Sequence, residues 1–150
     1  MLTASDIMEK EVISVYEDTG ISAAVKLLLE NHINGVPVIT PEKQVVGILC
    51  QSDLIFGLKE APMPPIFTLL DSFIPLASSK KIEADFNKMA AATVSQAMVK
   101  DPVTVDPETP VSELAALMVE KHFHTLPVVQ DHVLVGIIGK EDLLKTMTGK

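Results

Sequence analysis

The chain is an internal duplication. The stretch GILCQSDLI (47–55) recurs as GIIGKEDLL (136–144), and the residues that precede each stretch also match. With one residue dropped from a turn, 17 of 47 aligned positions are identical, whereas unrelated segments agree at roughly one position in fifteen. A chain that repeats a pattern of this length is expected to fold as two similar structural units.

Each copy has the pattern of a short strand, a helix, two further strands and a second helix. The short strands are VISV (12–15) and VTV (103–105), which are rich in β-branched residues. The first helices carry apolar stripes at helical spacing: Ile21, Ala24, Val25 and Leu28 in one copy, and Val111, Leu114, Ala115 and Met118 in the other. The later strands are expected to form two hairpins, VPVI (36–39) with VVGIL (45–49) and LPVV (126–129) with VLVGII (133–138). The second helices are expected to begin near Asp53 and Asp142, where acidic residues suit the positive end of the helix dipole.

These units define an α/β fold in which each unit has the order β-α-β-β-α. One unit of about 50 residues buries too little surface to be stable alone, so the two are expected to share a core. The repeats are assigned to residues 1–57 and 93–150, with an insert at 58–92. The insert contains four prolines and then a helical pattern. It is interpreted either as a packing or dimerisation element or as a lid or partner-binding arm.

The composition excludes several classes of partner and site. Twelve Lys and Arg residues against twenty Asp and Glu give a formal net charge of -8, which repels nucleic-acid phosphates, so no nucleic-acid polymer is expected as a partner. The single cysteine, Cys50, rules out an internal disulfide and a multi-cysteine zinc site. No apolar run approaches the roughly 18 residues of a membrane span, and the start lacks a signal-peptide pattern, so a cytoplasmic protein without a membrane partner is expected. The mean hydropathy of +0.33 indicates apolar surface buried between protomers, as in a homodimer.

The repeated motifs resemble the cystathionine β-synthase (CBS) domain family, in which such repeats occur in tandem. The resemblance rests on IMEKEVISV and AMVKDPVTV before the first helix of each copy, on GVPVI and TLPVV after it, and on GILCQSD and GIIGKED at the end. It implies two units packed sheet to sheet around a pseudo-two-fold axis, with two clefts between them. It also implies dimerisation, and clefts that bind AMP, ADP, ATP or S-adenosylmethionine in a sensor rather than an enzyme.

The resemblance places the two aspartates of the duplicated motif in these clefts. Asp53 and Asp142 each follow a strand and begin a helix, where a carboxylate is able to accept both hydroxyls of a ribose. A plain helix-capping role is the alternative for each. Backbone groups of Ile33-Asn34-Gly35 and Phe123-His124-Thr125 are expected to read an adenine edge. Four apolar residues are expected to line the slot for the base, although a core role is the favoured reading of each one taken singly: Ile13, Ile48, Val103 and Ile137.

Each cleft is expected to combine residues of both repeats. One cleft would contain Met8, Ile13, Ile33, His124, Ile137 and Asp142. The other would contain Asn34, Ile48, Cys50, Ser52, Asp53, Met98, Val103 and Phe123. His124 is the one candidate cation for a phosphate, so affinity is expected to rise as the pH falls; a partly exposed histidine at a strand entrance is the alternative. His32 and His122 are interpreted as structural residues at helix ends.

The leading hypothesis is a non-enzymatic module that senses an adenosine compound and signals to a regulated protein through a change in repeat or dimer packing. The alternative is a constitutive dimerisation or scaffold protein with ligand-free clefts that acts through its insert. No pairing of a nucleophile with a base is recognisable, so neither enzymatic activity nor a cofactor is expected. The nearest approach to a metal site, His122 and His124 with His132, lacks a further well-placed ligand, so no metal is expected.

Overall fold

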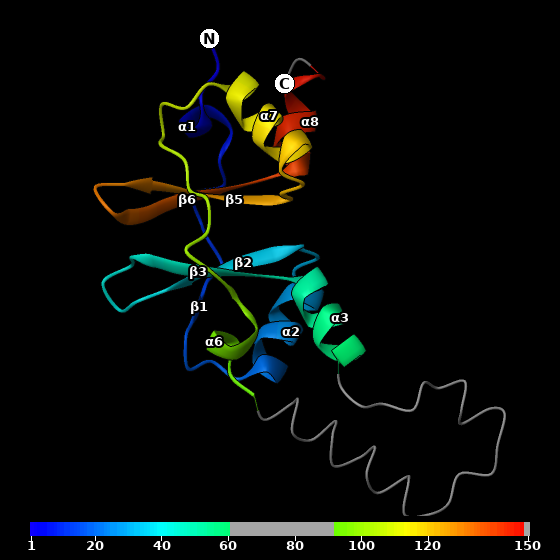
Figure 1. The fold of residues 1–150 in the computed structure, drawn as a ribbon. Helices are drawn as coiled ribbons and strands as arrows, with labels where there is room; N and C mark the ends of the chain where they lie inside the picture. Colours follow the sequence, from blue (N-terminus) through cyan, green and yellow to red (C-terminus); the bar gives the residue numbers. More distant parts are fainter. Residues whose placement is uncertain (61–91, 149–150) are drawn as a thin grey trace, which may run out of the picture.

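The chain folds into two stacked β-sheets with helices on both outer sides. The computed structural model describes residues 1–60 and 92–148. The two sheets face each other at the centre of the molecule, and helices cover their outer faces (Figure 1). This arrangement confirms the prediction of two α/β units packed sheet to sheet. The insert predicted at 58–92, with its helical segment, lies almost wholly outside the described residues.

The two sheets differ in size. The first sheet contains β1 (Val15–Tyr16), β2 (Gly35–Ile39), β3 (Val45–Cys50) and β4 (Val99–Lys100), in that order. β1 runs parallel to β2, and the other neighbours are antiparallel. The second sheet contains β5 (Thr125–Gln130) and β6 (Val133–Gly139), which are antiparallel. The predicted strand at 103–105 is reduced to an isolated parallel bridge between Val105 and Val128.

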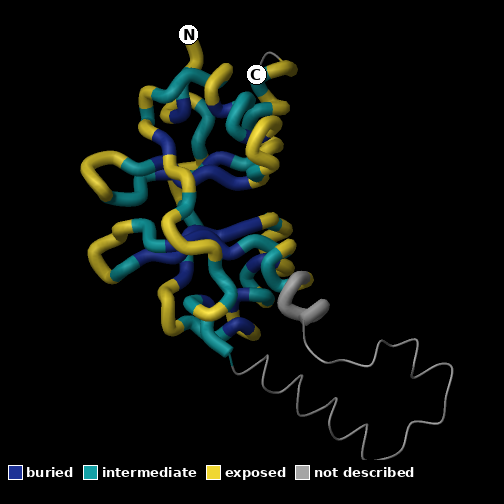
Figure 2. The backbone as a smooth tube through the Cα atoms, viewed as in Figure 1, coloured by how far each residue is buried: buried dark blue, intermediate teal, exposed yellow. Residues whose placement is uncertain are grey.

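Two pairs of helices cover the outer faces of the sheets. They are α2 (Ile21–Glu30) with α3 (Gln51–Glu60), and α7 (Val111–Glu120) with α8 (Lys140–Thr146). The buried residues of α2 and α7 come from the predicted apolar stripes: Ile21, Ala24, Leu28, Leu114 and Met118. The facing strands are largely buried, whereas the hairpin turns and the outer helix surfaces are exposed (Figure 2). In the described part of the chain, no helix has both the length and the apolar character needed to cross a membrane.

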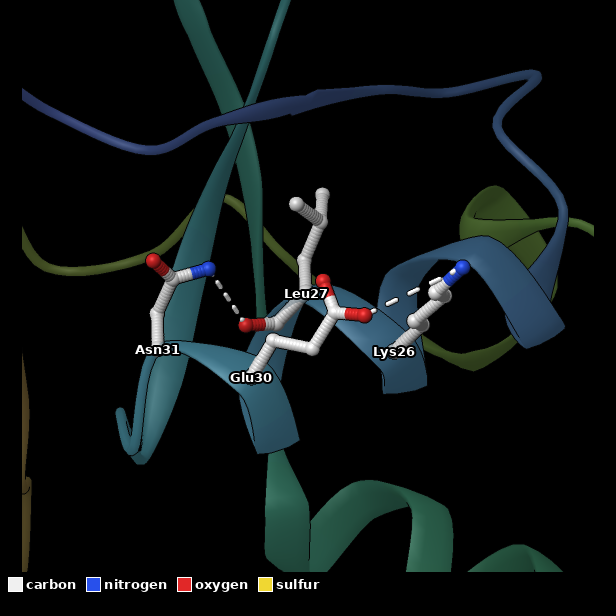
Figure 3. Close-up of polar contacts among 4 residues, drawn as sticks. All are labelled: Lys26, Leu27, Glu30 and Asn31. Carbon is white, nitrogen blue, oxygen red and sulfur yellow. Dashed lines mark hydrogen bonds and ion pairs between the residues drawn. The ribbon is translucent and has the colours of Figure 1, made fainter.

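The end of α2 turns the chain toward the centre of the molecule. His32 takes a left-handed conformation (φ 52°) and donates its N–H to the Leu29 carbonyl at 3.3 Å, while the Ile33 N–H donates to the Leu28 carbonyl at 3.1 Å. This pair of bonds is a Schellman motif. Asn31 adds a side-chain bond from Nδ2 to the Leu27 carbonyl at 2.9 Å (Figure 3). His122 has the same left-handed conformation (φ 59°) after α7, so both histidines do shape helix ends as predicted.

The first helical turn of each repeat belongs to the core of the other repeat. The short helix α1 (Ala4–Ile7) lies beside α7 and α8, and α6 (Val94–Ala97) lies beside α2 (Figure 1). Ala4 is fully buried in the core built around α7, and Val94 is fully buried in the core built around α2. Backbone hydrogen bonds hold the exchanged helices in place. Ala4 N–H donates to the Thr109 carbonyl and Val94 N–H donates to the Thr19 carbonyl, both at 2.8 Å. The structure thus has two cores, each completed by a residue of the other repeat, in place of the single shared core that was expected.

After each exchanged helix, a methionine packs against a glycine of the other repeat. Met98 packs against Gly47 of β3, and Met8 packs against Gly136 of β6, so closely that a Cβ atom on either glycine would overlap the methionine sulfur. The adjoining backbone pairs with the same strands, since Val99 is opposite Ile48 and Glu9 is opposite Ile137. These Met and Gly residues, which are the same in both copies, thus hold each crossing segment against a strand of the other repeat.

Candidate functional site

A cavity of about 230 Å³ lies between the two repeats. The first repeat contributes the end of β3 and the start of α3 through Ile48, Cys50, Ser52 and Asp53. The crossing segment at and after β4 contributes Val99, Asp101, Pro102 and Val103. The chain from the end of α7 to the first residue of β5 contributes His122, Phe123, His124 and Thr125. The cavity therefore exists only because β4 crosses from the second repeat to pair with β3 of the first.

Asp53 is held in the cavity by the start of α3. Its Oδ2 accepts a hydrogen bond from the backbone N–H of Cys50 at 2.8 Å, and Asp142 Oδ2 accepts the same bond from Gly139 at 2.7 Å. The helix-capping role considered for both aspartates is therefore real. It uses one carboxylate oxygen, and no hydrogen bond within the described residues engages Oδ1 of Asp53. This second oxygen is available to a ligand in the cavity.

Burial changes the acidity of two groups in the cavity wall. Desolvation raises the pKa of the Asp53 carboxyl, although the hydrogen bond from Cys50 N–H acts in the opposite direction. Desolvation also raises the pKa of the Cys50 thiol to about 11, and the charge of nearby Asp53 contributes to this increase. Cys50 and Asp53 are both partly buried in this wall, so a hydrogen bond made to Asp53 here is stronger than one made on an open surface.

Thr125 supplies an unpaired hydroxyl at the contact between the repeats. It is only 8% exposed, is the one buried polar residue among those described, and makes no side-chain hydrogen bond to the described protein. A buried hydroxyl without a partner is unfavourable, so its presence in a cavity wall favours a ligand that completes its bonding. Gly35 leaves space beside this hydroxyl, because a Cβ atom at position 35 would lie 3.0 Å from Cys50 Sγ and 3.2 Å from Thr125 Oγ1.

The structure divides the predicted ligand-binding residues into two groups. Eight of them line the cavity: Ile48, Cys50, Ser52, Asp53, Val103, Phe123, His124 and Thr125. His124 was assigned to the cleft of Asp142, yet it lines the cavity of Asp53. The others do not line this cavity: Met8, Ile13, Ile33, Asn34, Gly35, Met98, Ile137 and Asp142.

Gln51 binds backbone that was expected to read a base, at Ile33 in the cleft of Asp142 and at Asn34 in the cleft of Asp53. Its side-chain Nε2 donates to the Ile33 carbonyl at 2.9 Å, and its own N–H donates to the Asn34 carbonyl at 2.9 Å. Both carbonyls are thus already bonded. Around Asp142, the Ile137 N–H and carbonyl are likewise bonded to Glu9. The residues predicted for this second cleft mainly serve packing and backbone pairing in the structure.

Four residues of the cavity wall were not predicted from the sequence: Val99, Asp101, Pro102 and His122. Asp101 is the most consequential, because it adds a second carboxylate, and it takes a left-handed conformation (φ 50°) directly before Pro102. His122 was interpreted as purely structural, but it both ends the helix and lines the cavity. A signal for these residues was present in the Met and Gly pairs, which mark where β4 crosses.

The histidines do not gather into a metal site. His132 lines a different cavity, together with Gln44, Val45, Thr104 and Val129, whereas His122 and His124 line the one described above. Among residues 1–60 and 92–148, no group of three or more His, Cys, Asp or Glu side chains is arranged to hold a metal ion.

Two pseudo-symmetric α/β units that exchange their first helices and enclose a cavity between their sheets define a tandem-repeat module. The CBS domain model matches this chain twice, at residues 4–60 and 94–149. The chain therefore belongs to the CBS domain family.

The chain is also similar to individual relatives and to solved structures. The chain is 28% identical to the uncharacterized protein MJ1426 of Methanocaldococcus jannaschii, over 98% of this chain and 92% of that protein. It is similar to the crystal structure of CBSX2 in complex with AMP, with a TM-score of 0.75, 24% identity and coverage of 99% and 98% of the two chains. It is also similar to the CBS domain pair of protein MJ0100 in complex with 5′-methylthioadenosine and S-adenosyl-L-methionine, with a TM-score of 0.74, 22% identity and coverage of 99% and 98%. At these identities, the two structures establish the fold.

Proposed function

We propose that this protein is a non-enzymatic regulatory module that binds an adenosine-containing ligand in the cavity between its repeats. The observation that carries the proposal is the pairing of an available carboxylate oxygen, on Asp53, with the buried and unpaired hydroxyl of Thr125 in one cavity wall. The complexes of CBSX2 with AMP and of MJ0100 with adenosine derivatives support this class of ligand. The reducing cytoplasm suits the free thiol of Cys50, so we place the module there.

The wall offers a complementary surface to each part of an adenosine. Asp53 Oδ1 accepts a hydrogen bond from the ribose hydroxyls, because its other oxygen is committed to Cys50 N–H. Ile48, Val103 and Phe123 supply apolar surface for the base. The ligand touches both repeats, so it favours the relative packing of the repeats that closes around it. That shift in packing is the signal passed to a partner protein.

Adenosine ligands are expected to raise the thermal stability of the protein, and Asp53→Asn is expected to abolish this effect. A ligand at about 100 times its dissociation constant stabilises the native state by roughly 2.7 kcal/mol. The measurement is a thermal-shift series with AMP, ADP, ATP, S-adenosylmethionine and 5′-methylthioadenosine at millimolar concentration. Asparagine keeps an acceptor for the Cys50 N–H, so the fold is retained while the charged partner of the ribose is lost.

Asp142→Asn is the matched control, because Asp142 makes the same capping bond in the other repeat. Loss of the shift in Asp53→Asn alone assigns binding to the described cavity. Loss in Asp142→Asn alone would move the site to the other repeat. If none of the ligands changes the melting temperature of the unmodified protein, the constitutive scaffold becomes the better proposal.

We further propose that the module is a homodimer formed through its helices. Both repeats expose large apolar residues at corresponding helix positions, Leu29 with Val119 and Ile55 with Leu144. Glutamate at Leu29 and Val119 together is expected to convert the protein from twice the 16.2 kDa chain mass to a single chain, because a charge in an apolar interface is left without a partner. Analytical ultracentrifugation measures the mass. Tyr16→Glu, an exposed apolar position on β1 away from these helices, is the control that keeps the dimer.

A further inference from the structure

We infer that the cavity selects adenosine ligands whose 5′ group carries no net negative charge, and that Asp101 determines this selectivity. The inference rests on the proposed function and narrows it. It distinguishes a neutral thioether or a cationic sulfonium, as in 5′-methylthioadenosine or S-adenosylmethionine, from the phosphates of AMP and ATP.

The charges of the wall favour this class of ligand. Two carboxylates, Asp53 and Asp101, line the cavity, and the described residues that line it include no lysine or arginine. The other side chains of the lining that could favour an anion are the imidazoles of His122 and His124. Phosphate recognition in proteins commonly relies on Lys and Arg side chains or on free backbone N–H groups. Neither kind of cationic side chain occurs among the described residues of this wall.

The start of α3 does not replace the missing cations. The N-terminus of a ten-residue helix is a favourable position for a phosphate, because its N–H groups and dipole attract negative charge. Here the carboxylate of Asp53 occupies that position and accepts the Cys50 N–H. A phosphate at the same helix end would meet this resident negative charge.

Asp101 adds a second carboxylate, on an exposed residue whose backbone is held from both sides. It directly follows β4, whose Lys100 is paired with Gly47, and it directly precedes Pro102, whose ring restricts the backbone. Both carboxylates line the same cavity of about 230 Å³, so a negative charge on a ligand bound there is repelled by both. Repulsion within about 8 Å, the Debye length at physiological salt, is only partly screened.

Calorimetric titration of four ligands tests the selectivity: 5′-methylthioadenosine, S-adenosylmethionine, AMP and ATP, at pH 8 and low salt. The unmodified protein is expected to bind the two sulfur compounds at least about 10-fold more tightly than AMP, with ATP weakest. Asp101→Asn is expected to raise the affinity for AMP relative to 5′-methylthioadenosine by about 5- to 10-fold. High salt should reduce the difference between the two ligands in the unmodified protein, because it screens the carboxylates.

Glu11→Gln is the matched control. Glu11 corresponds to Asp101 in the other repeat, is exposed and does not line the cavity, so its removal changes the net charge equally without changing the affinity ratio. The inference is overturned if AMP or ATP binds the unmodified protein as tightly as 5′-methylthioadenosine, or if Asp101→Asn and Glu11→Gln change the ratio equally. In either case an adenosine ligand still binds, and the proposed function stands. If none of the four ligands binds, the proposed function fails and the selectivity fails with it.

Discussion

Leu28→Ala is expected to lower the free energy of unfolding by about 2–5 kcal/mol, which is the usual cost of truncating a buried leucine. Leu28 lies on the inner face of α2, is 1% exposed and packs in the core that also contains Val36 and Leu49 of the first sheet. Val94 of α6 belongs to the same core, so the cavity left by the truncation also loosens the exchanged helix. Urea denaturation followed by circular dichroism measures the change.

Lys26→Ala is the control in the same helix. Lys26 is exposed, and its ion pair with Glu30 spans 3.8 Å on the surface, where such pairs contribute only about 0.3–0.5 kcal/mol (Figure 3). This variant is expected to unfold within about 0.5 kcal/mol of the unmodified protein. Equal losses in the two variants would contradict the assignment of Leu28 to a tightly packed core.

Local patterns in the sequence were enough to predict the two units. The apolar stripes of α2 and α7 and the paired strands of each hairpin depend on residues close in the chain, so their spacing predicts their structure directly. The duplication then predicts that the units are alike. The one missing strand, at 103–105, is a difference in length between equivalent elements, which a pattern of three β-branched residues does not resolve.

The exchange of α1 and α6 could not be predicted in the same way. Each helix has four residues, too few for an apolar stripe, and each is closed locally by a Thr backbone N–H bonded to the side chain three residues later. The repeat against which each helix packs is determined by hydrogen-bond partners far away in the sequence, such as Thr109 for Ala4 and Thr19 for Val94. Those contacts leave no periodic trace in the sequence.

The difference between local patterns and contacts between distant segments also explains which site residues could be predicted. Asp53 was identified because it recurs at the same place in each copy and begins a helix. Asp101 lies in a turn, and its place in the cavity wall follows from the pairing of β4 with β3, a contact between segments about fifty residues apart. A cavity formed by a crossing segment is predictable only once the crossing itself is known.

The thiol of Cys50 is expected to react with iodoacetamide about two orders of magnitude more slowly at pH 8 than an ordinary cysteine does. The thiolate is the reactive form, and a thiol whose pKa is raised to about 11 is ionised at roughly one part in a thousand at that pH, against about a quarter for a free cysteine. Mass spectrometry follows the reaction without ambiguity, because Cys50 is the only cysteine of the chain. The urea-denatured protein supplies the ordinary rate.

The pH dependence of this reaction separates ionisation from simple steric protection. With the pKa of Cys50 near 11, the logarithm of the rate should rise steadily from pH 7.5 to 10, whereas a buried but normally acidic thiol would reach a plateau near pH 9. Asp53→Asn should speed the reaction, because the Asp53 charge is the second cause of the raised pKa after burial. The same shift makes the native state bind the thiol proton more tightly than the unfolded chain does. Stability is therefore expected to fall as the pH rises from about 9 toward 11, where the unfolded chain releases this proton first. A plateau below pH 9, or a rate unaffected by Asp53→Asn, would show that Cys50 does not lie beside Asp53 in a dehydrated wall.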